Sequence, residues 1–335
     1  MKLAIRADMN ETIATGHVMR CLSVADAVTD AGGEVLFVTA DTCALDLLHA
    51  RGYEVIVLGT DWRSMEEELP VWEKLVADQS LDGVLVDSYA VTEKYLRDLN
   101  RLLPVTYMDD LAAIRIETDA IVNYEIYARP EDYETSRTDP LLYLGPSYAP
   151  LREQFGKCKP RRVSAAVERI LLMSGGTDPE HMLDRLIALL PPRQYAKIHV
   201  LCGRSNAYRA QLKKKYADRP ELELHGFVND MRRLYESVDL AITAGGSTVY
   251  ELAATGTPSI TYALADNQLR NVREFDARDL MDYAGDARIP GEVEGKLPEL
   301  LDKNEHPLLR QRRADEMQCL LDGKGAERFA RILLR

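Results

Sequence analysis

Short apolar runs alternate with longer amphipathic segments along most of the chain, and this alternation constrains the fold more than any other feature. Short apolar runs are typical of buried strands, whereas apolar residues spaced three and four apart indicate helices. Strand–helix–strand units join parallel strands through right-handed crossovers. The sequence therefore predicts an α/β protein built on mostly parallel sheets.

The first half of the chain carries one complete set of such units. Glycines end the first two helices, at Gly32-Gly33 and Gly52, where a left-handed cap needs no side chain. The predicted strands are 2–6, 34–39, 54–58, 83–87, 104–108 and 120–122, and the predicted helices are 16–31, 43–50, 65–78 and 92–102.

The pattern breaks between residues 144 and 169, where prolines and a basic run (157–162) indicate a hinge, and then restarts. The second half has predicted strands at 169–173, 197–201, 222–224, 240–243 and 259–262, and helices at 180–190, 207–216, 230–237, 248–255 and 267–277, with one or two more helices over 305–334. We expect two Rossmann-like domains, 1–150 and 165–335, whose sheets face an interdomain cleft that takes a nucleotide-linked substrate. In such folds a C-terminal helix often packs back on the first domain.

Composition excludes several classes of protein. A length of 335 residues suits two domains, and a net charge of −12 argues against a nucleic-acid partner. The five cysteines are scattered and no pair has metal-ligand spacing, which indicates free thiols rather than zinc. Because no signal peptide or bilayer-spanning apolar run is evident, we expect a cytoplasmic protein without membrane insertion. We also expect a monomer, since no strongly apolar surface stripe remains once the helices are assigned.

The Gly16-His17 pair stands at the turn between the first strand and the first helix. In an open α/β sheet this turn lies at the carboxyl end of the strand, where ligands bind. Histidine can exchange a proton near neutral pH, so His17 is a candidate acid–base group. The alternative is an exposed or capping histidine. The other histidines are interpreted as structural because they have no evident partner: His49, His181, His199, His225 and His306.

Two glycine-rich turns follow strands in the second half, at Ser174-Gly175-Gly176-Thr177-Asp178 and Ala244-Gly245-Gly246-Ser247-Thr248. Glycine lets the backbone approach a phosphate, and the first N–H groups of a helix bind anions. Neither turn has the Walker ending or the Gly-x-Gly-x-x-Gly spacing. A single such turn is usually only a tight turn, but two at the same end of one sheet favour a diphosphate.

Three further groups of polar residues follow strands. Glu251 lies one helical turn after Ser247, where a carboxylate can accept bonds from a ribose diol or simply support the helix start. Asp266-Asn267-Gln268 can bind sugar hydroxyls and acetamido groups or cap a helix. Asp109-Asp110 has no third metal ligand at suitable spacing and is interpreted as polar wall or capping residues. No nucleophile elbow, Cys–His pair or nicotinamide fingerprint is present, so covalent catalysis and hydride transfer are poorly supported.

Taken together, these segments resemble the GT-B glycosyltransferases over nearly the whole chain, in particular the lipid-linked N-acetylglucosaminyltransferase of peptidoglycan synthesis. They resemble still more the family of UDP-2,4-diacetamido-2,4,6-trideoxy-β-L-altropyranose hydrolases of pseudaminic acid biosynthesis. The resemblance is carried by Ile5-Arg6-Ala7-Asp8, Gly16-His17-Val18-Met19-Arg20, Val86-Asp87-Ser88-Tyr89, Asp109-Asp110, Val122-Asn123, the run 145–155, Ser174-Gly175-Gly176-Thr177-Asp178 and Asn267-Gln268.

This resemblance implies metal-free, cofactor-free hydrolysis of the UDP-linked diacetamido sugar with inversion at the anomeric carbon. His17 would be the general base, while Tyr89 and Asn267 would orient the sugar or the water. Glu251 would hold the ribose, and the backbone near Phe227 to Met231 the uracil. The N–H groups of Gly246, Ser247 and Thr248 would stabilise the departing diphosphate. The remaining substrate contacts would come from Asp8, Gly16, Arg20, Gly175, Gly176, Thr177 and Gln268.

Three other functions stay open on the sequence. A GT-B glycosyltransferase would use the same UDP-sugar site but would need an acceptor surface. A non-catalytic sensor would bind the UDP-sugar without turnover. A hydrolase or epimerase for another UDP-linked diamino sugar would have the same motifs.

Overall fold

The structure is a computed structural model, and it describes residues 1–10, 12–13, 15–133, 139–176, 178–203, 206, 208–226 and 228–335. The chain divides into two compact units. The first unit contains Met1–Glu153 together with Lys324–Arg335, and the second contains Gln154–Gly323. The chain therefore leaves the first unit once and returns to it with its last twelve residues.

The first unit is built on a seven-stranded parallel sheet with the order β3-β2-β1-β4-β5-β6-β7. Its strands are β1 (Lys2–Ala7), β2 (Glu34–Thr39), β3 (Glu54–Val57), β4 (Gly83–Asp87), β5 (Val105–Met108), β6 (Ala120–Asn123) and β7 (Leu141–Leu144). Its helices are α1 (Gly16–Asp30), α2 (Leu45–Ala50), α3 (Leu69–Gln79), α4 (Glu93–Asn100) and α12 (Gly325–Leu333), with short 3₁₀ turns at Met65–Glu68, Pro130–Tyr133 and Pro146–Tyr148.

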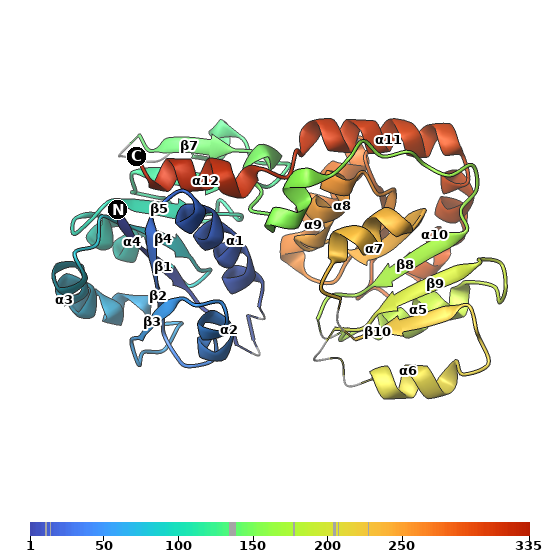
Figure 1. Ribbon diagram of the computed structural model, residues 1–335, viewed down its shortest axis with the longest axis horizontal. Coiled ribbons are helices and arrows are strands. Elements are labelled where there is room, and N and C mark those ends of the chain that lie inside the picture. The colour runs from blue at the N-terminus through green and yellow to red at the C-terminus, as the bar shows by residue number, and fades with distance from the viewer. Residues whose placement is uncertain are drawn as a thin grey trace. The chain divides into compact units, whose positions relative to one another are not determined.

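Helices cover both faces of this sheet because the strands are apolar on both sides. On one face, Trp72 of α3 and Tyr95 and Leu99 of α4 are buried in the main apolar cluster. On the sheet's helical layer, α1 packs against α12, which lies beside it in Figure 1 although the starts of the two helices are 309 positions apart along the chain. A side chain at Gly33, just after α1, would press against Leu334, so the end of α1 packs closely against the C-terminal segment.

The second unit is built on a six-stranded parallel sheet with the order β10-β9-β8-β11-β12-β13. Its strands are β8 (Arg169–Met173), β9 (Lys197–Leu201), β10 (Leu222–His225), β11 (Leu240–Ala244), β12 (Ser259–Ala263) and β13 (Asp282–Asp286). Its helices are α5 (Met182–Leu189), α6 (Arg209–Lys215), α7 (Met231–Ser237), α8 (Thr248–Thr255), α9 (Asp266–Ala277), α10 (Glu292–Asn304) and α11 (Pro307–Leu320), and the 3₁₀ turn Glu153–Lys157 stands at its start.

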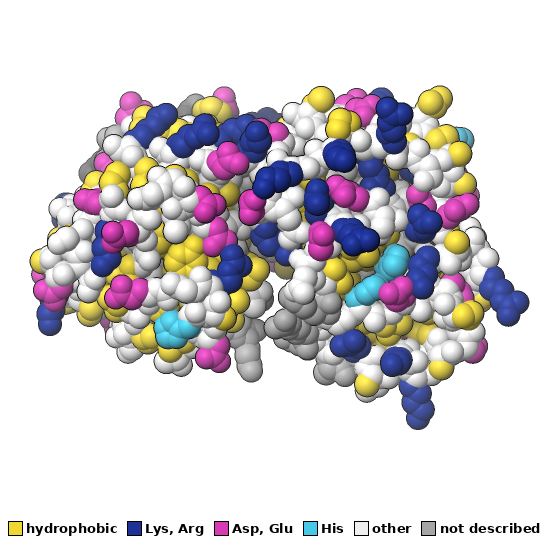
Figure 2. All heavy atoms as spheres, in the orientation of Figure 1, with side chains coloured by type: hydrophobic (Ala, Val, Ile, Leu, Met, Phe, Trp, Pro, Cys, Tyr) yellow, Lys and Arg dark blue, Asp and Glu magenta, His cyan; other side chains and the backbone are white. Residues whose placement is uncertain are grey.

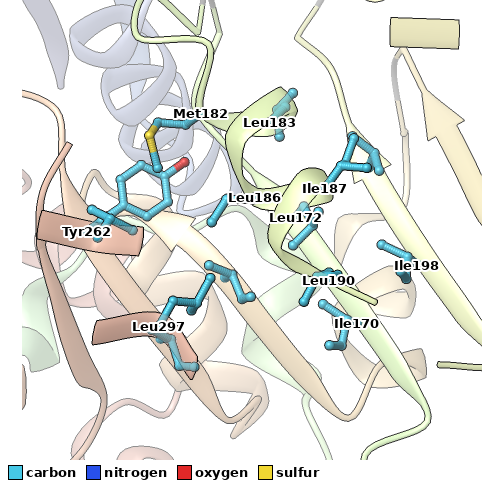
Figure 3. Packing of buried hydrophobic residues seen from close by; sticks show 14 of the residues in the cluster. Ile170, Leu172, Met182, Leu183, Leu186, Ile187, Leu190, Ile198, Tyr262 and Leu297 are labelled. Atoms are coloured by element: carbon cyan, nitrogen blue, oxygen red, sulfur yellow. The ribbon is translucent and has the colours of Figure 1, made fainter. Parts of the chain in front are cut away.

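The core of the second unit lies between the sheet and helices α5 and α10 (Figure 3). Leu172 of β8, Leu186 of α5 and Leu297 of α10 are all buried there. The side chain of Tyr262 on β12 reaches past β11 to β8, where its hydroxyl donates to the carbonyl of Met173 at 2.7 Å. This bond fixes the carboxyl end of β8 against that of β12, next to both glycine-rich turns.

The predicted class of two α/β units with parallel sheets is confirmed. The sequence analysis did not predict β7, β13 or α10. The segment of β13 (Asp282–Asp286) is too polar to look like a buried strand, and β7 is a partly exposed edge strand. The segment predicted as one or two helices at the end is two helices, α11 and α12, which belong to different units. Among the described residues, no helix combines the length and apolarity needed to cross a bilayer.

Candidate functional site

A cluster of polar side chains lies at the carboxyl ends of the central strands of the first unit. His17 and Arg20 come from the first turns of α1, Asp87 is the last residue of β4, Asp110 follows β5, and Tyr124 follows β6. Parallel strands bring these positions to one edge of the sheet, which is where open α/β proteins bind ligands. We call these five residues the His17 cluster.

His17 is held by a buried carboxylate. Its Nδ1 lies 2.6 Å from Oδ1 of Asp87, whose side chain is fully buried. An ionised carboxylate can only accept, so Nδ1 carries the proton of the neutral ring and Nε2 keeps its lone pair. Nε2 has no partner within the part of the chain that the structure describes. The arrangement is that of a histidine oriented to accept a proton at Nε2.

Arg20 ties the cluster together with a forked set of bonds. Its Nε and Nη2 donate to the two oxygens of Asp87 at 2.6 and 2.5 Å. Its Nη1 donates to Asp110 and to the hydroxyl of Tyr124, both at 2.9 Å. A planar guanidinium with two bonds to one carboxylate is a rigid pairing. Arg20 therefore fixes Asp87, and through it the ring of His17.

The charges in this cluster are strongly coupled. Burial opposes ionisation of Asp87, but Arg20 and His17 outweigh it and hold the pKa of this carboxyl well below its usual range. Burial likewise opposes the charge of Arg20, yet Asp87, Tyr124 and Asp110 raise the pKa of the guanidinium well above its usual value. Asp87 is thus a permanent anion beside the histidine, and an anion there stabilises an imidazolium that forms during a reaction.

Tyr89 lies over this cluster. The edge of the His17 ring meets its ring with centroids 4.6 Å apart, and its hydroxyl donates to Asp110 at 2.7 Å. Its side chain is 41% exposed, so it stands between the buried cluster and solvent. A side chain added at Gly16 would meet nothing within 4 Å, which leaves the backbone beside His17 open to a ligand. The structure thus brings Gly16, His17 and Tyr89 together.

The carboxylates of Asp8 and Asp109 accept hydrogen bonds from other residues of the first unit. Asp8 accepts from Arg6 Nη1 at 2.5 Å and from the backbone N–H of Ala40 at 2.7 Å. Asp109 accepts from the Tyr133 hydroxyl at 2.6 Å and from two backbone N–H groups just after it. Burial raises the pKa of the Asp109 carboxyl. Asp8 and Asp109 therefore shape the loops around the site.

In the second unit, the turn Gly245-Gly246-Ser247 joins β11 to α8 at the carboxyl end of the sheet. The N–H groups of Val249 and Tyr250 bond to the carbonyls of Gly246 and Ser247, both at 3.1 Å. The preceding N–H groups, of residues 246–248, meet no acceptor among the described residues. Unsatisfied donors at a helix start form a ready site for an anion.

Space around the two glycines differs sharply. A Cβ at Gly245 would overlap Val272 of α9, whereas a Cβ at Gly246 would meet only the amide of Gln268, at 4.0 Å. Gly245 is therefore required by packing, and Gly246 leaves the backbone open on its outer side. Gln268 is held in place because its Oε1 accepts the N–H of Leu264 at 2.9 Å.

Other predicted residues of the second unit lie around this turn or near it. The Tyr235 hydroxyl donates to Oε2 of Glu251 at 2.9 Å, which fixes this carboxylate in the first turn of α8. Asn267 is exposed in the first turn of α9, next to Gln268. Met231, the first residue of α7, is buried.

The first glycine-rich turn is tightly braced. Ser174 donates to Asp178 at 2.6 Å, and Asp178 in turn accepts the N–H of Met182 at 2.7 Å, at the start of α5. Gly175 is in the left-handed region, with φ +69°, and a Cβ there would meet nothing within 4 Å. Gly176 and Gly203 touch so closely that a Cβ at Gly203 would overlap the carbonyl of Gly176. Thr177 and Phe227, both predicted to contact substrate, lie outside the described residues.

Sequence reasoning overlooked several members of these sites. Asp87, Asp110 and Tyr124 were not assigned to His17, and Tyr235 was not assigned to Glu251. Asp87 had a usable signal, since it ends the strand next to β1 in any sheet that places the first and fourth strands side by side. The others are aromatic or acidic residues whose role depends on their distant partners.

One interpretation of the histidines is wrong. His199 and His225 were expected to lack a partner, but their rings meet, with Nδ1 of His199 2.9 Å from Nε2 of His225. They lie on neighbouring strands, 26 residues apart in sequence, so the spacing along the chain does not reveal them. Burial lowers the pKa of both imidazoles.

Known proteins resemble this chain in its overall fold and in the sequence of its second unit. Residues 170–325 match the model of the family described as glycosyltransferase family 28 C-terminal domain. Among solved structures, MurG of Acinetobacter baumannii superposes with a TM-score of 0.73 over 100% of this chain and 99% of that one, at 17% identity. The chain therefore has the GT-B fold, and residues 170–325 of its second unit are similar to the glycosyltransferase family 28 C-terminal domain.

Two curated relatives are similar in sequence over most of this chain. An uncharacterised protein of Methanocaldococcus jannaschii is 26% identical over 81% of this chain and 57% of its own length. A protein of Helicobacter pylori, named pseudaminic acid cytidylyltransferase and UDP-2,4-diacetamido-2,4,6-trideoxy-beta-L-altropyranose hydrolase, is 23% identical over 68% of this chain and 44% of its own length. The chain thus spans about half the length of these two relatives.

Proposed function

We propose that this GT-B protein hydrolyses a UDP-linked 2,4-diacetamido-2,4,6-trideoxyhexose, the UDP-linked 6-deoxy-L-altrose derivative of pseudaminic acid biosynthesis, to UDP and the free sugar. The observation that carries the proposal is the His17–Asp87 pair. A buried carboxylate on Nδ1 leaves Nε2 of His17 as the basic nitrogen, at the edge of the sheet where ligands bind. The hydrolase name of the Helicobacter pylori relative supports the choice of substrate.

The proposed reaction is one inverting displacement. Water attacks the anomeric carbon from the face opposite UDP while Nε2 of His17 takes its proton. A C–O bond forms to water, the bond from the anomeric carbon to the diphosphate oxygen breaks, and its electron pair leaves with UDP. Help from one positioned base is typically worth about 10²–10⁴-fold in rate. The Asp87 anion supports this step because it stabilises the imidazolium as it forms.

The departing diphosphate needs positive partners. We assign them to the N–H groups at residues 246–248, which the helix start of α8 leaves without acceptors in the described part of the chain. Glu251, held by Tyr235, would accept from the ribose hydroxyls. The open backbone at Gly175 and Gly176 would take part with Thr177, and the segment from Phe227 to Met231 would hold the uracil.

Among the described residues, few side chains are available to bind the sugar. Tyr89 and Gly16 border His17 and would orient the water or an acetamido group. Asn267 and Gln268 would bind sugar substituents from the second unit. Arg20 and Asp8 have internal partners, so we assign them to positioning rather than to direct contact with the sugar. Like the metal-free chemistry, the monomeric state and the cytoplasmic location, these roles are proposals.

The family of the second unit favours one other function. A glycosyltransferase family 28 C-terminal domain fits a transferase that passes the sugar from UDP to an acceptor hydroxyl instead of water. In that case His17 would deprotonate the acceptor. The two reactions share every donor-side residue and differ only in the nucleophile.

The decisive experiment follows the nucleophile. The protein is incubated with the UDP-linked diacetamido sugar and EDTA in ¹⁸O-water, and products are analysed by mass spectrometry and proton NMR. We expect ¹⁸O in the free sugar, unlabelled UDP and an inverted first-formed anomer. His17→Phe should lose about 10²-fold or more in turnover while keeping its affinity for UDP. UDP binding without release of sugar, in the absence of an acceptor, would refute the hydrolase.

A further inference from the structure

His199, Glu223 and His225 gather on one face of two neighbouring strands in the second unit. His199 belongs to β9, and Glu223 and His225 belong to β10; Figure 2 shows histidine side chains next to an acidic side chain on this face of the second unit. β10 is the edge strand, and its register places Glu223 level with His199. Ile198 and Val200 point the other way, into the core. We call His199, Glu223 and His225 the edge-strand triad.

The three side chains converge on one point. Nδ1 of His199 lies 2.9 Å from Nε2 of His225, 3.9 Å from Oε2 of Glu223, and Nε2 of His225 lies 3.8 Å from Oε1 of Glu223. One donor atom from each residue lies within 4.8 Å of the other two. A tetrahedral ion with bonds of about 2.0 Å holds neighbouring ligand atoms about 3.3 Å apart. The triad therefore needs only small side-chain rotations to surround such an ion.

The chemistry of the donors selects the ion. Two imidazoles and one carboxylate suit zinc and its neighbours among the divalent transition metals, whereas Mg²⁺ and Ca²⁺ favour oxygen ligands alone. We propose that the edge-strand triad binds one divalent transition-metal ion of the zinc type, with the fourth position open to solvent. The side chains of His199 and His225 are 14% and 19% exposed, and that of Glu223 is 47% exposed, so an ion can enter directly.

A lysine competes for this position. Nζ of Lys197 lies 2.8 Å from Oε2 of Glu223, on the same face of β9 as His199. Its ammonium satisfies the carboxylate and repels a dication. Metal binding must therefore displace Lys197 from Glu223, and the affinity of the site depends on how strongly this lysine holds the carboxylate.

The site would fasten an edge strand. β10 has a strand neighbour on one side only, and its ladder to β9 is four residue pairs long. A metal held by His199 of β9 and by two residues of β10 crosslinks the two strands at their carboxyl ends. The proposed hydrolysis uses none of these residues, so this inference stands or falls independently of the proposed function.

The test is a titration of the metal-free 335-residue chain with Zn²⁺ by calorimetry. We expect one site per chain that depends on the triad. His225→Gln and His199→Gln should each weaken it by at least about tenfold, which is the loss typical even of an outer-shell partner. His306→Gln serves as the matched control, because it removes an imidazole outside the triad. Both exposed cysteines, Cys43 and Cys319, are changed to serine in every variant so that thiols do not bind the metal.

Two further measurements separate a metal site from a simple histidine pair. Cu²⁺ bound at the triad should show hyperfine coupling to imidazole nitrogens in electron paramagnetic resonance, and His225→Gln should abolish this signal. Lys197→Gln should tighten Zn²⁺ binding by about thirtyfold, the effect in water of removing one unit charge about 4 Å from a dication. Zn²⁺ binding that is unchanged in both triad variants, or absent from the parent protein, would overturn the proposal.

Discussion

At the scale of single residues, Asp87 is the buried carboxylate that both orients His17 and pairs with Arg20. It meets His17, accepts two bonds from Arg20, and lies within hydrogen-bonding reach of Cys21 Sγ at 3.4 Å. A buried charge is costly unless it is paired, and Asp87 is paired with a guanidinium on one side and an imidazole on the other. The same carboxylate therefore contributes to folding and to the proposed chemistry.

We predict that Asp87→Asn lowers kcat by about 10²–10⁴-fold, as expected when a positioned base loses its orientation and its anion. The amide can no longer stabilise the imidazolium, and it can hold the wrong tautomer of His17. Affinity for UDP should stay at the level of the unmodified protein. Steady-state kinetics and calorimetry on the same samples check both parts. An equal loss of UDP affinity would instead indicate a damaged fold.

The same variant should change how stability depends on pH. The pKa of Asp87 in the folded protein is well below its usual value, so the ionised carboxylate stabilises the folded state. This contribution is complete above the unfolded pKa of about 3.9 and is lost as the pH falls toward the folded pKa. The difference in unfolding free energy between the unmodified protein and Asp87→Asn should therefore be constant above about pH 5 and shrink below about pH 4.

Denaturant unfolding at a series of pH values measures this difference. Asp78→Asn, at an exposed position of α3, is the control for the change in net charge. It should leave the pH profile of stability unchanged. A pH-independent difference for Asp87→Asn would mean that Asp87 titrates alike in both states.

At the scale of elements, the two adjacent glycines in the turn between β11 and α8 have different structural roles. Gly245 is packed against Val272 of α9, while Gly246 is open on its outer side. Neither of them has a positive φ, so backbone strain does not explain either residue. Packing against α9 therefore explains the first glycine, whereas the second leaves the backbone open to a ligand.

We predict opposite effects for the two alanine variants. Gly245→Ala should destabilise the protein by about 1–3 kcal/mol, the usual cost of overpacking. Gly246→Ala should change stability by less than about 1 kcal/mol, yet weaken UDP binding by about tenfold because its methyl group stands where the diphosphate approaches. Denaturant unfolding and calorimetry with UDP measure the two effects. Unchanged UDP affinity in Gly246→Ala would remove this turn from the phosphate site.

At the scale of the whole molecule, the chain folds its last helix into the first unit. A Cβ at Gly325 would overlap the carbonyl of Ala149, and Arg328 donates to the carbonyl of Ser147 at 2.9 Å. Phe329 of α12 is fully buried. The first unit is therefore complete only when residues from both ends of the chain are present.

We predict that Phe329→Ala destabilises the first unit by about 3–5 kcal/mol, the usual cost of deleting a buried aromatic ring. Arg331→Ala, at an exposed position of the same helix, should cost no more than about 0.5 kcal/mol. Hydrogen exchange followed by mass spectrometry should show the loss of protection in α1 and not in β8. Equal protection of α1 in both variants would contradict a stabilising role for α12.

The sequence by itself determined the local structure and where chemistry could lie. The periods of apolar residues identified most strands and helices of both units, and the positions after strands pointed to His17, Tyr89 and the two glycine-rich turns. These features are local, because element type depends on spacing and a parallel strand exposes its carboxyl end whichever strands lie beside it.

Only the tertiary structure decided which of these residues meet. Asp87 contacts His17 across 70 positions, His225 contacts His199 across 26, and α12 crosses from the end of the chain to α1. Such contacts depend on strand order and on which helix covers which face, and the spacing of residues along the chain does not specify either. The polar strand β13 was missed for the same reason, since its place is set by pairing with β12 rather than by its own hydrophobicity.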